Sequence, residues 1–173
     1  MLASFRRRLT YHIGDLVYGA NDGIITTFAV VAGAAGAGFS STVILALGVA
    51  NLVADGFSMG ASKFLSLRSE QEVSHAPRMT RARDALHDGI ATFAAFVIAG
   101  SLPLLPFIVP AAAQHAFVVS SVATGIALFL VGSARALVLP KHALLAGLEM
   151  FVVGGAAAAL AYVFGSWVEL LMR

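Results

Sequence analysis

Long apolar runs separated by short polar segments dominate this chain. Five runs approach or exceed the roughly 20 apolar residues that a membrane-spanning helix needs, and they cover residues 14–38, 41–67, 86–109, 113–138 and 143–172. Charge clusters or short turns rich in Gly, Pro and Ser separate them. The pattern predicts an all-α polytopic membrane protein, with five transmembrane helices in a single domain over residues 1–173. Pro103 and Pro106 should kink the third helix or end its regular part.

Composition supports a membrane protein and excludes several other classes. Hydrophobic residues make up 59% of the chain and charged residues 12%, with a mean hydropathy of +0.88; soluble domains are about one quarter charged. The absence of cysteine excludes disulfides, thiolate metal sites and thiol catalysis. The net charge of +2 comes from basic residues that flank apolar runs. We therefore expect the lipid bilayer as a partner and no nucleic acid.

Basic residues gather in alternate connections. They lie before the first run, between the second and third, and between the fourth and fifth: Arg6, Arg7, Arg8, Arg68, Arg78, Arg81, Arg83, Arg135 and Lys141. The positive-inside rule then predicts a cytoplasmic N-terminus and, after five crossings, a C-terminus on the other side. Because an odd number of spans cannot form a two-fold repeat over the whole chain, any symmetry would come from a homodimer.

Two carboxylates stand inside runs that should cross the membrane. Asp22 and Asp55 would cost several kcal/mol at bilayer depth unless they line a path or are paired within the bundle. By helix rise, Asp22 lies roughly 24 Å, Asp55 roughly 21 Å and Met59 roughly 27 Å from the outer ends of their spans. The three residues therefore share one layer, toward the cytoplasmic half.

Polar positions also share helix faces. The second span has a polar stripe with a period of four: Asn51, Asp55, Met59 and Lys63. Asp15 and Asp22 are seven residues apart and share a face of the first span. The two stripes can face each other, and Lys63 and Asp15 would lie at similar depth near the inner surface. There a salt bridge or snorkelling would accommodate both.

The residue types in this layer suit a divalent cation. Asp22, Asp55 and an amide oxygen from Asn21 or Asn51 would supply oxygen ligands, while the thioether of Met59 favours a transition metal over magnesium or calcium. Iron(II) or manganese(II) would fit. The alternative is that the carboxylates only hold helices together by hydrogen bonds and that Met59 fills the core.

Motifs along most of the chain resemble the vacuolar iron transporter family. The matching segments are DLVYGANDGIITTFAVVAGAAGA, NLVADGFSMGASKFLSLRSE, TFAAFVIAGSLPLLPF, ALFLVGSARA and GLEMFVVGGAAAALAYVFG, all in family order. The resemblance implies a five-helix homodimer that moves ferrous iron, and often manganese, out of the cytosol in exchange for protons. The metal is then a transported substrate and no cofactor is expected. The implied pathway lies at the dimer interface and is lined by Asp15, Asp22 and Met59.

The chain departs from that family in two places. Eukaryotic members carry an acidic helical insert between spans two and three, whereas residues 67–85 hold few metal-binding side chains: Glu70, Glu72, His75 and Asp84. Many members have a glutamate in the turn after the methionine, where this chain has Lys63; the carboxylate stands one turn before the methionine, as Asp55. Either the metal site of this chain lies one helical turn from its position in the family, or the transported substrate differs.

Other polar residues are expected to have structural roles. Glu70, Glu72 and His75 belong to a solvated connecting loop, and Glu149 should pair with Arg135 or Lys141. A transporter is the leading function class, and a non-transporting scaffold or accessory subunit is the alternative. An enzyme is not expected, since no nucleophile and base share a depth. The location would be the plasma membrane in a prokaryote or the vacuolar membrane in a eukaryote.

Overall fold

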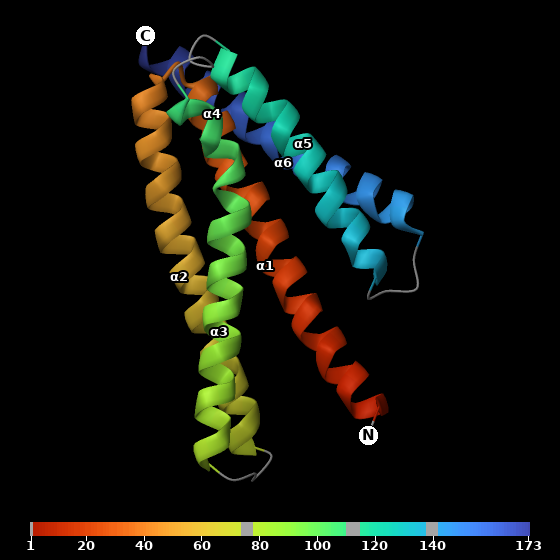
Figure 1. The fold of residues 1–173 in the computed structure, drawn as a ribbon. Coiled ribbons are helices and arrows are strands. Elements are labelled where there is room, and N and C mark those ends of the chain that lie inside the picture. Colours follow the sequence, from red (N-terminus) through yellow and green to blue (C-terminus); the bar gives the residue numbers. More distant parts are fainter. Residues whose placement is uncertain (1, 74–77, 110–114, 138–141) are drawn as a thin grey trace.

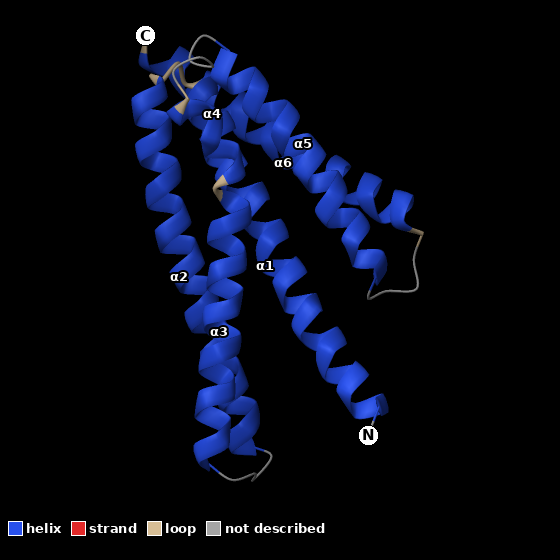
Figure 2. Ribbon diagram, in the orientation of Figure 1, coloured by secondary structure: helices blue, strands red, loops and turns tan. Residues whose placement is uncertain are grey.

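The computed structural model describes residues 2–73, 78–109, 115–137 and 142–173. Within these ranges it describes side chains from residue 14 onward, except those of residues 15, 71, 73, 78–82 and 137. Figure 2 shows that the described ranges are almost entirely helical, and no strand occurs in them. This confirms the predicted all-α class.

Long helices account for most of the described chain. They are α1 (Leu2–Gly36), α2 (Ser41–Val73), α3 (Arg78–Gly100), α5 (Ala116–Ala134) and α6 (Ala143–Met172). These five are long and apolar enough to cross a membrane. The protein is therefore an integral membrane protein with the predicted set of spans.

Three helix ends lie beyond the apolar runs. α1 begins at Leu2, α2 continues to Val73 and α3 begins at Arg78, so Glu70 and Glu72 lie on a helix and the predicted connecting loop is wrong for them. Polar residues continue α2 because they pair along it: Arg68 lies 3.5 Å from Glu72, at i,i+4 spacing. The hydropathy of the sequence indicates which residues cross the membrane. A helix can continue past them for as long as its backbone hydrogen bonds continue. His75 lies outside the described residues.

The third span breaks where its prolines predict. α3 ends at Gly100 and is followed by the 3-10 turn η1 (Leu102–Leu104) and the short helix α4 (Leu105–Ile108). Pro103 lies in η1 and Pro106 in α4, where neither has a backbone N–H to continue the ladder. The buried hydroxyl of Ser120 on α5 donates a 2.6 Å hydrogen bond to the carbonyl of Pro103. This bond ties α5 to the broken end of the span.

The bundle has α1 between two helix pairs. α2 and α3 pack together and against α1 on one side, while α5 and α6 pack together and against α1 on the other. In Figure 1 the helices converge near the C-terminus and spread apart toward the N-terminus. Side chains of α1 line a cavity with each helix pair.

Glycines allow the closest helix crossings. A Cβ on Gly60 of α2 would lie 2.8 Å from the carbonyl oxygen of Gly89 on α3, and a Cβ on Gly89 would lie 2.7 Å from the carbonyl oxygen of Gly60. Gly23 of α1 similarly abuts the backbone of Phe96 on α3. Small residues let backbones approach in a membrane, where no hydrophobic effect drives helices together. These contacts fix α1, α2 and α3 against one another.

Candidate metal-binding groove

A polar groove of about 440 Å³ lies among α1, α2 and α3. Its lining comes from all three helices: Tyr18, Asp22, Asp55, Ser58, Met59, Ser62, Lys63, Ser66 and Thr92. The structure thus brings Asp22 of α1 to the same groove as Asp55, Met59 and Lys63 of the polar stripe on α2. This is the facing arrangement that the sequence predicts for those two helices.

Helix periodicity explains the contribution of α2. Its lining residues recur at steps of three and four, which keeps them on one face of a helix with 3.6 residues per turn. Asp55 is exposed on this face, whereas Met59 and Lys63 are partly buried. The carboxylate, the thioether and the ammonium group therefore follow one another along the groove.

The other two helices position the facing wall. Asp22 is partly buried on α1, and its backbone carbonyl accepts a 2.9 Å hydrogen bond from the hydroxyl of Thr26. Thr92 of α3 is buried, and its hydroxyl donates to the carbonyl of Asp88 at 2.9 Å. Asp22 and Asp55 are the two carboxylates of the lining, and a negatively charged oxygen is a stronger ligand for a cation than the hydroxyl groups around it.

Two predicted amide ligands lie elsewhere. Asn51 does not line the groove, and its side-chain nitrogen is buried without a hydrogen-bond partner. Asn21 lines a second cavity, and its side-chain oxygen is also buried without a partner. The side chain of Asp15 lies outside the described residues. Among the side chains that are described, no three from His, Cys, Asp and Glu form a group that could hold a metal ion.

The second cavity, of about 490 Å³, lies on the other side of α1 against α5 and α6. Here Arg135 lies 3.8 Å from Glu149, between Nη1 and Oε2, and donates from Nη1 to the sulfur of Met150 at 3.2 Å. The predicted pairing of Glu149 with Arg135 is confirmed, while Lys141 lies outside the described residues. Tyr18 lines both cavities. The ion pair explains Glu149 without a role for substrate.

Hydroxyl groups in the groove were not foreseen from the sequence. Ser58, Ser62 and Ser66 extend the stripe of α2, and Tyr18 lies one turn before Asp22 on α1. A search at steps of three or four residues from Asp55 would have found the serines, because 58, 62 and 66 follow 55 at steps of three, four and four. Thr92 carries no such signal, because its place depends on which face of α3 packs toward α1.

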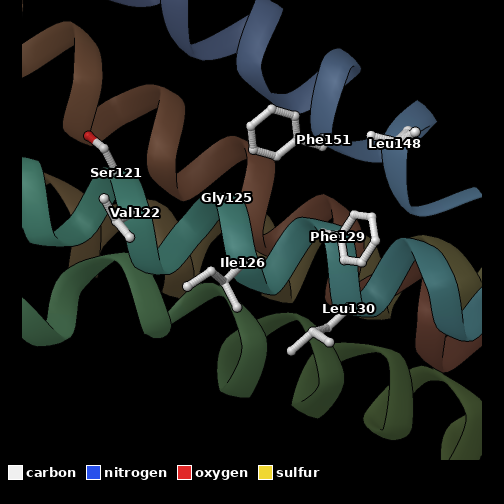
Figure 3. A pocket seen from close by; sticks show the side chains of 8 residues that line it. All are labelled: Ser121, Val122, Gly125, Ile126, Phe129, Leu130, Leu148 and Phe151. Atoms are coloured by element: carbon white, nitrogen blue, oxygen red, sulfur yellow. The ribbon is translucent and has the colours of Figure 1, made fainter. Parts of the chain in front are cut away.

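A larger apolar hollow carries no comparable chemistry. Figure 3 shows its lining side chains on α5 and α6, with a volume of about 600 Å³. Ser121 is the one polar side chain in this lining, and its hydroxyl bonds to the carbonyl of Phe117 on its own helix at 2.7 Å. A lipid-facing apolar surface accounts for this hollow, so the polar groove is the better candidate for function.

Comparison with known proteins identifies the family of the chain. Residues 13–85 and 77–166 match the model of the VIT family. The chain belongs to the VIT family. The two matched parts overlap at residues 77–85, near the beginning of α3.

Curated relatives cover nearly the whole chain. The vacuolar iron transporter of Toxoplasma gondii (strain ATCC 50861 / VEG) is 25% identical over 93% of this chain and 76% of its own length. Vacuolar iron transporter 1 of Arabidopsis thaliana is 24% identical over 91% of this chain and 86% of its own length. Both matched regions, of 228 and 216 residues, exceed the 173 residues of this chain. The relatives therefore contain extra residues within the matched region.

Proposed function

We propose that this protein is a secondary transporter of divalent transition metals, with iron(II) as the main substrate and manganese(II) as a second one. The observation that carries the proposal is the groove that gathers Asp22, Asp55 and Met59 inside membrane-spanning helices. Membership of the VIT family and relatives named vacuolar iron transporter support it.

The chemistry of the lining suits such a substrate. The carboxylates of Asp22 and Asp55 would offset the charge of a divalent ion, which cannot otherwise enter a low-dielectric region. The thioether of Met59 is a soft donor, which iron(II) and manganese(II) accept more readily than magnesium or calcium does. Hydroxyls along α2 would replace part of the hydration shell. The ion would thus meet a partial coordination sphere and keep some of its water.

A second copy of the chain would complete the site. Among the described residues, one protomer supplies two carboxylates and a thioether to an open groove, fewer ligands than a six-coordinate ion requires. In a two-fold dimer the same surface of each subunit meets its equivalent. Packing groove against groove would enclose one pathway and double its carboxylates, so we infer a homodimer with the path at its interface.

Proton exchange follows from the same carboxylates. Each can hold either a proton or a share of the metal ion, so metal binding releases protons and protonation releases metal. If the N-terminus is cytoplasmic, as the basic residues indicate, the divergent end of the bundle opens to the cytosol. Metal would enter there and leave on the opposite side, while protons return.

The test is metal flux through the purified protein in sealed liposomes. We expect iron(II), kept reduced with ascorbate, and manganese(II) to enter vesicles that contain the protein, whereas magnesium does not. A pH-sensitive dye inside the vesicles should report proton movement in step with metal. Flux without proton movement would replace exchange by uniport. If no metal enters at any imposed pH gradient, the transporter proposal fails and a non-transporting scaffold becomes the better account.

A further inference from the structure

Lys63 places a positive charge in the groove that should receive a cation. It lines the same groove as Asp22, Asp55 and Met59, and it lies one turn beyond Met59 on α2. Side chains on a helix lean toward the helix N-terminus. For Lys63 that is the direction of Met59 and Asp55. Lys63 is partly buried, and this lean should carry its ammonium group toward the proposed metal site.

We propose that Lys63 is a tethered cation that competes with the metal ion and sets the affinity of the groove for divalent ions. This inference rests on the proposed function and adds a residue that determines specificity. Among the described side chains, the groove carries the two aspartates and this one lysine as charged groups, a formal net charge of −1. A divalent ion would take that total to +1, whereas it would bring a groove without the lysine to neutrality.

Coulomb's law gives the size of the effect. With the ammonium group about 10 Å from the ion, the repulsion weakens binding roughly 4-fold at the dielectric constant of water and more than 100-fold at an effective value of 20. The penalty doubles with the charge of the ion, so it acts more strongly on divalent than on monovalent cations. Lys63 would keep the site from holding metal so tightly that release limits transport.

A structural role makes the opposite prediction. If Lys63 chiefly holds α2 in place or keeps Asp22 and Asp55 correctly oriented, its loss would loosen the groove and weaken metal binding. Removal of a competing cation instead strengthens binding. The sign of the change in affinity separates the two roles, and a stability measurement alone would not.

The experiment measures manganese(II) binding to the full-length protein in nanodiscs, by the loss of the free-ion electron paramagnetic resonance signal. The variants are Lys63→Gln, Lys63→Leu, Lys63→Arg and Arg68→Gln. Arg68→Gln is the matched control, because it removes the same charge from the same helix outside the groove, where Arg68 lies 3.5 Å from Glu72. Lys63→Leu adds no metal-binding atom and serves if Lys63→Gln does not fold.

We expect Lys63→Gln and Lys63→Leu to bind manganese(II) at least about 4-fold more tightly than wild type at low salt, with a smaller gain at high salt. Lys63→Arg and Arg68→Gln should stay close to wild type. Equal or weaker binding by both neutral variants would overturn the role of Lys63 while leaving the transporter proposal intact, provided that wild type binds. If neither wild type nor any variant binds, both proposals fail. Binding by the neutral variants alone would support the inference most strongly.

Discussion

Gly60→Ala tests the helix crossing that positions Met59. The new methyl group would lie 2.8 Å from the carbonyl oxygen of Gly89 and 3.0 Å from the Cβ of Phe93. Both neighbours are too close, and a backbone carbonyl cannot move away by changing rotamer. The substitution should therefore push α2 away from α3. Overpacking of this kind costs about 1–3 kcal/mol, and the better helix propensity of alanine offsets up to about 1 kcal/mol.

From the middle of the overpacking range, about 2 kcal/mol, the net expectation is a loss of about 1–2 kcal/mol in the free energy of unfolding. For a chain of this size that corresponds to a melting temperature roughly 2–8 °C lower. Gly155→Ala is the matched control, because a Cβ on this α6 residue would have no neighbour within 4 Å. It should melt at or above the wild-type temperature. Thermal unfolding in detergent, followed by size-exclusion chromatography of the folded fraction, measures both.

The result that would refute this reasoning is a Gly60→Ala protein as stable as wild type and Gly155→Ala. The backbones of α2 and α3 would then not cross as closely as described. The geometry that turns Met59 and Asp55 toward Asp22 would lose its support, since all three depend on how α2 sits against its neighbours.

Three further changes examine separate contacts. Met59→Leu should reduce the preference for iron(II) over magnesium when the two ions compete for flux, and its packing cost should stay below about 1.5 kcal/mol. If magnesium competes equally well in the variant and in wild type, Met59 only fills the core. Ser120→Ala should lower the free energy of unfolding by about 1–3 kcal/mol, because it leaves the buried carbonyl of Pro103 without its hydrogen bond from α5. Ser121→Ala should cost less, because Ser121 bonds to a carbonyl of its own helix. Equal losses in the two variants would contradict this. Glu149→Gln should cost less than about 1 kcal/mol, since its pair with Arg135 is partly exposed; a larger loss would indicate a stronger pair.

The sequence predicts the spans well because membrane thickness constrains the length of an apolar run. It predicts the helix ends poorly, since polar residues such as Arg68 and Glu72 continue α2 past its apolar run by pairing along it. The break in the third span was predictable because proline removes a backbone donor. Hydropathy indicates whether lipid or water surrounds a helix, so it predicts the spans. The ends of the helix depend on local hydrogen bonding, which hydropathy does not describe.

The candidate site was predictable in part for a related reason. Asp55, Met59 and Lys63 recur at helical spacing, so one face of α2 had to carry them. Asn51 shares that face but lies a turn farther toward the convergent end of the bundle, where its nitrogen is buried. Asn21 is adjacent to Asp22, and neighbouring residues on a helix point about 100° apart, which places Asn21 in the other cavity. The positions of Asn51 and Asn21 depend on their depth in the bundle and on which helices pack beside them. The periodicity of the sequence contains neither kind of information.

The central claim is that metal crosses the membrane through the groove that holds Asp22, and paired carboxylate substitutions test it most directly. Asp22→Asn and Glu149→Gln each neutralise one carboxylate within a span, but they lie in the cavities on opposite sides of α1. The measurement is iron(II) uptake into proteoliposomes at equal content of folded protein. We predict that Asp22→Asn falls to the level of empty liposomes while Glu149→Gln retains wild-type flux. Wild-type uptake by Asp22→Asn would contradict the account.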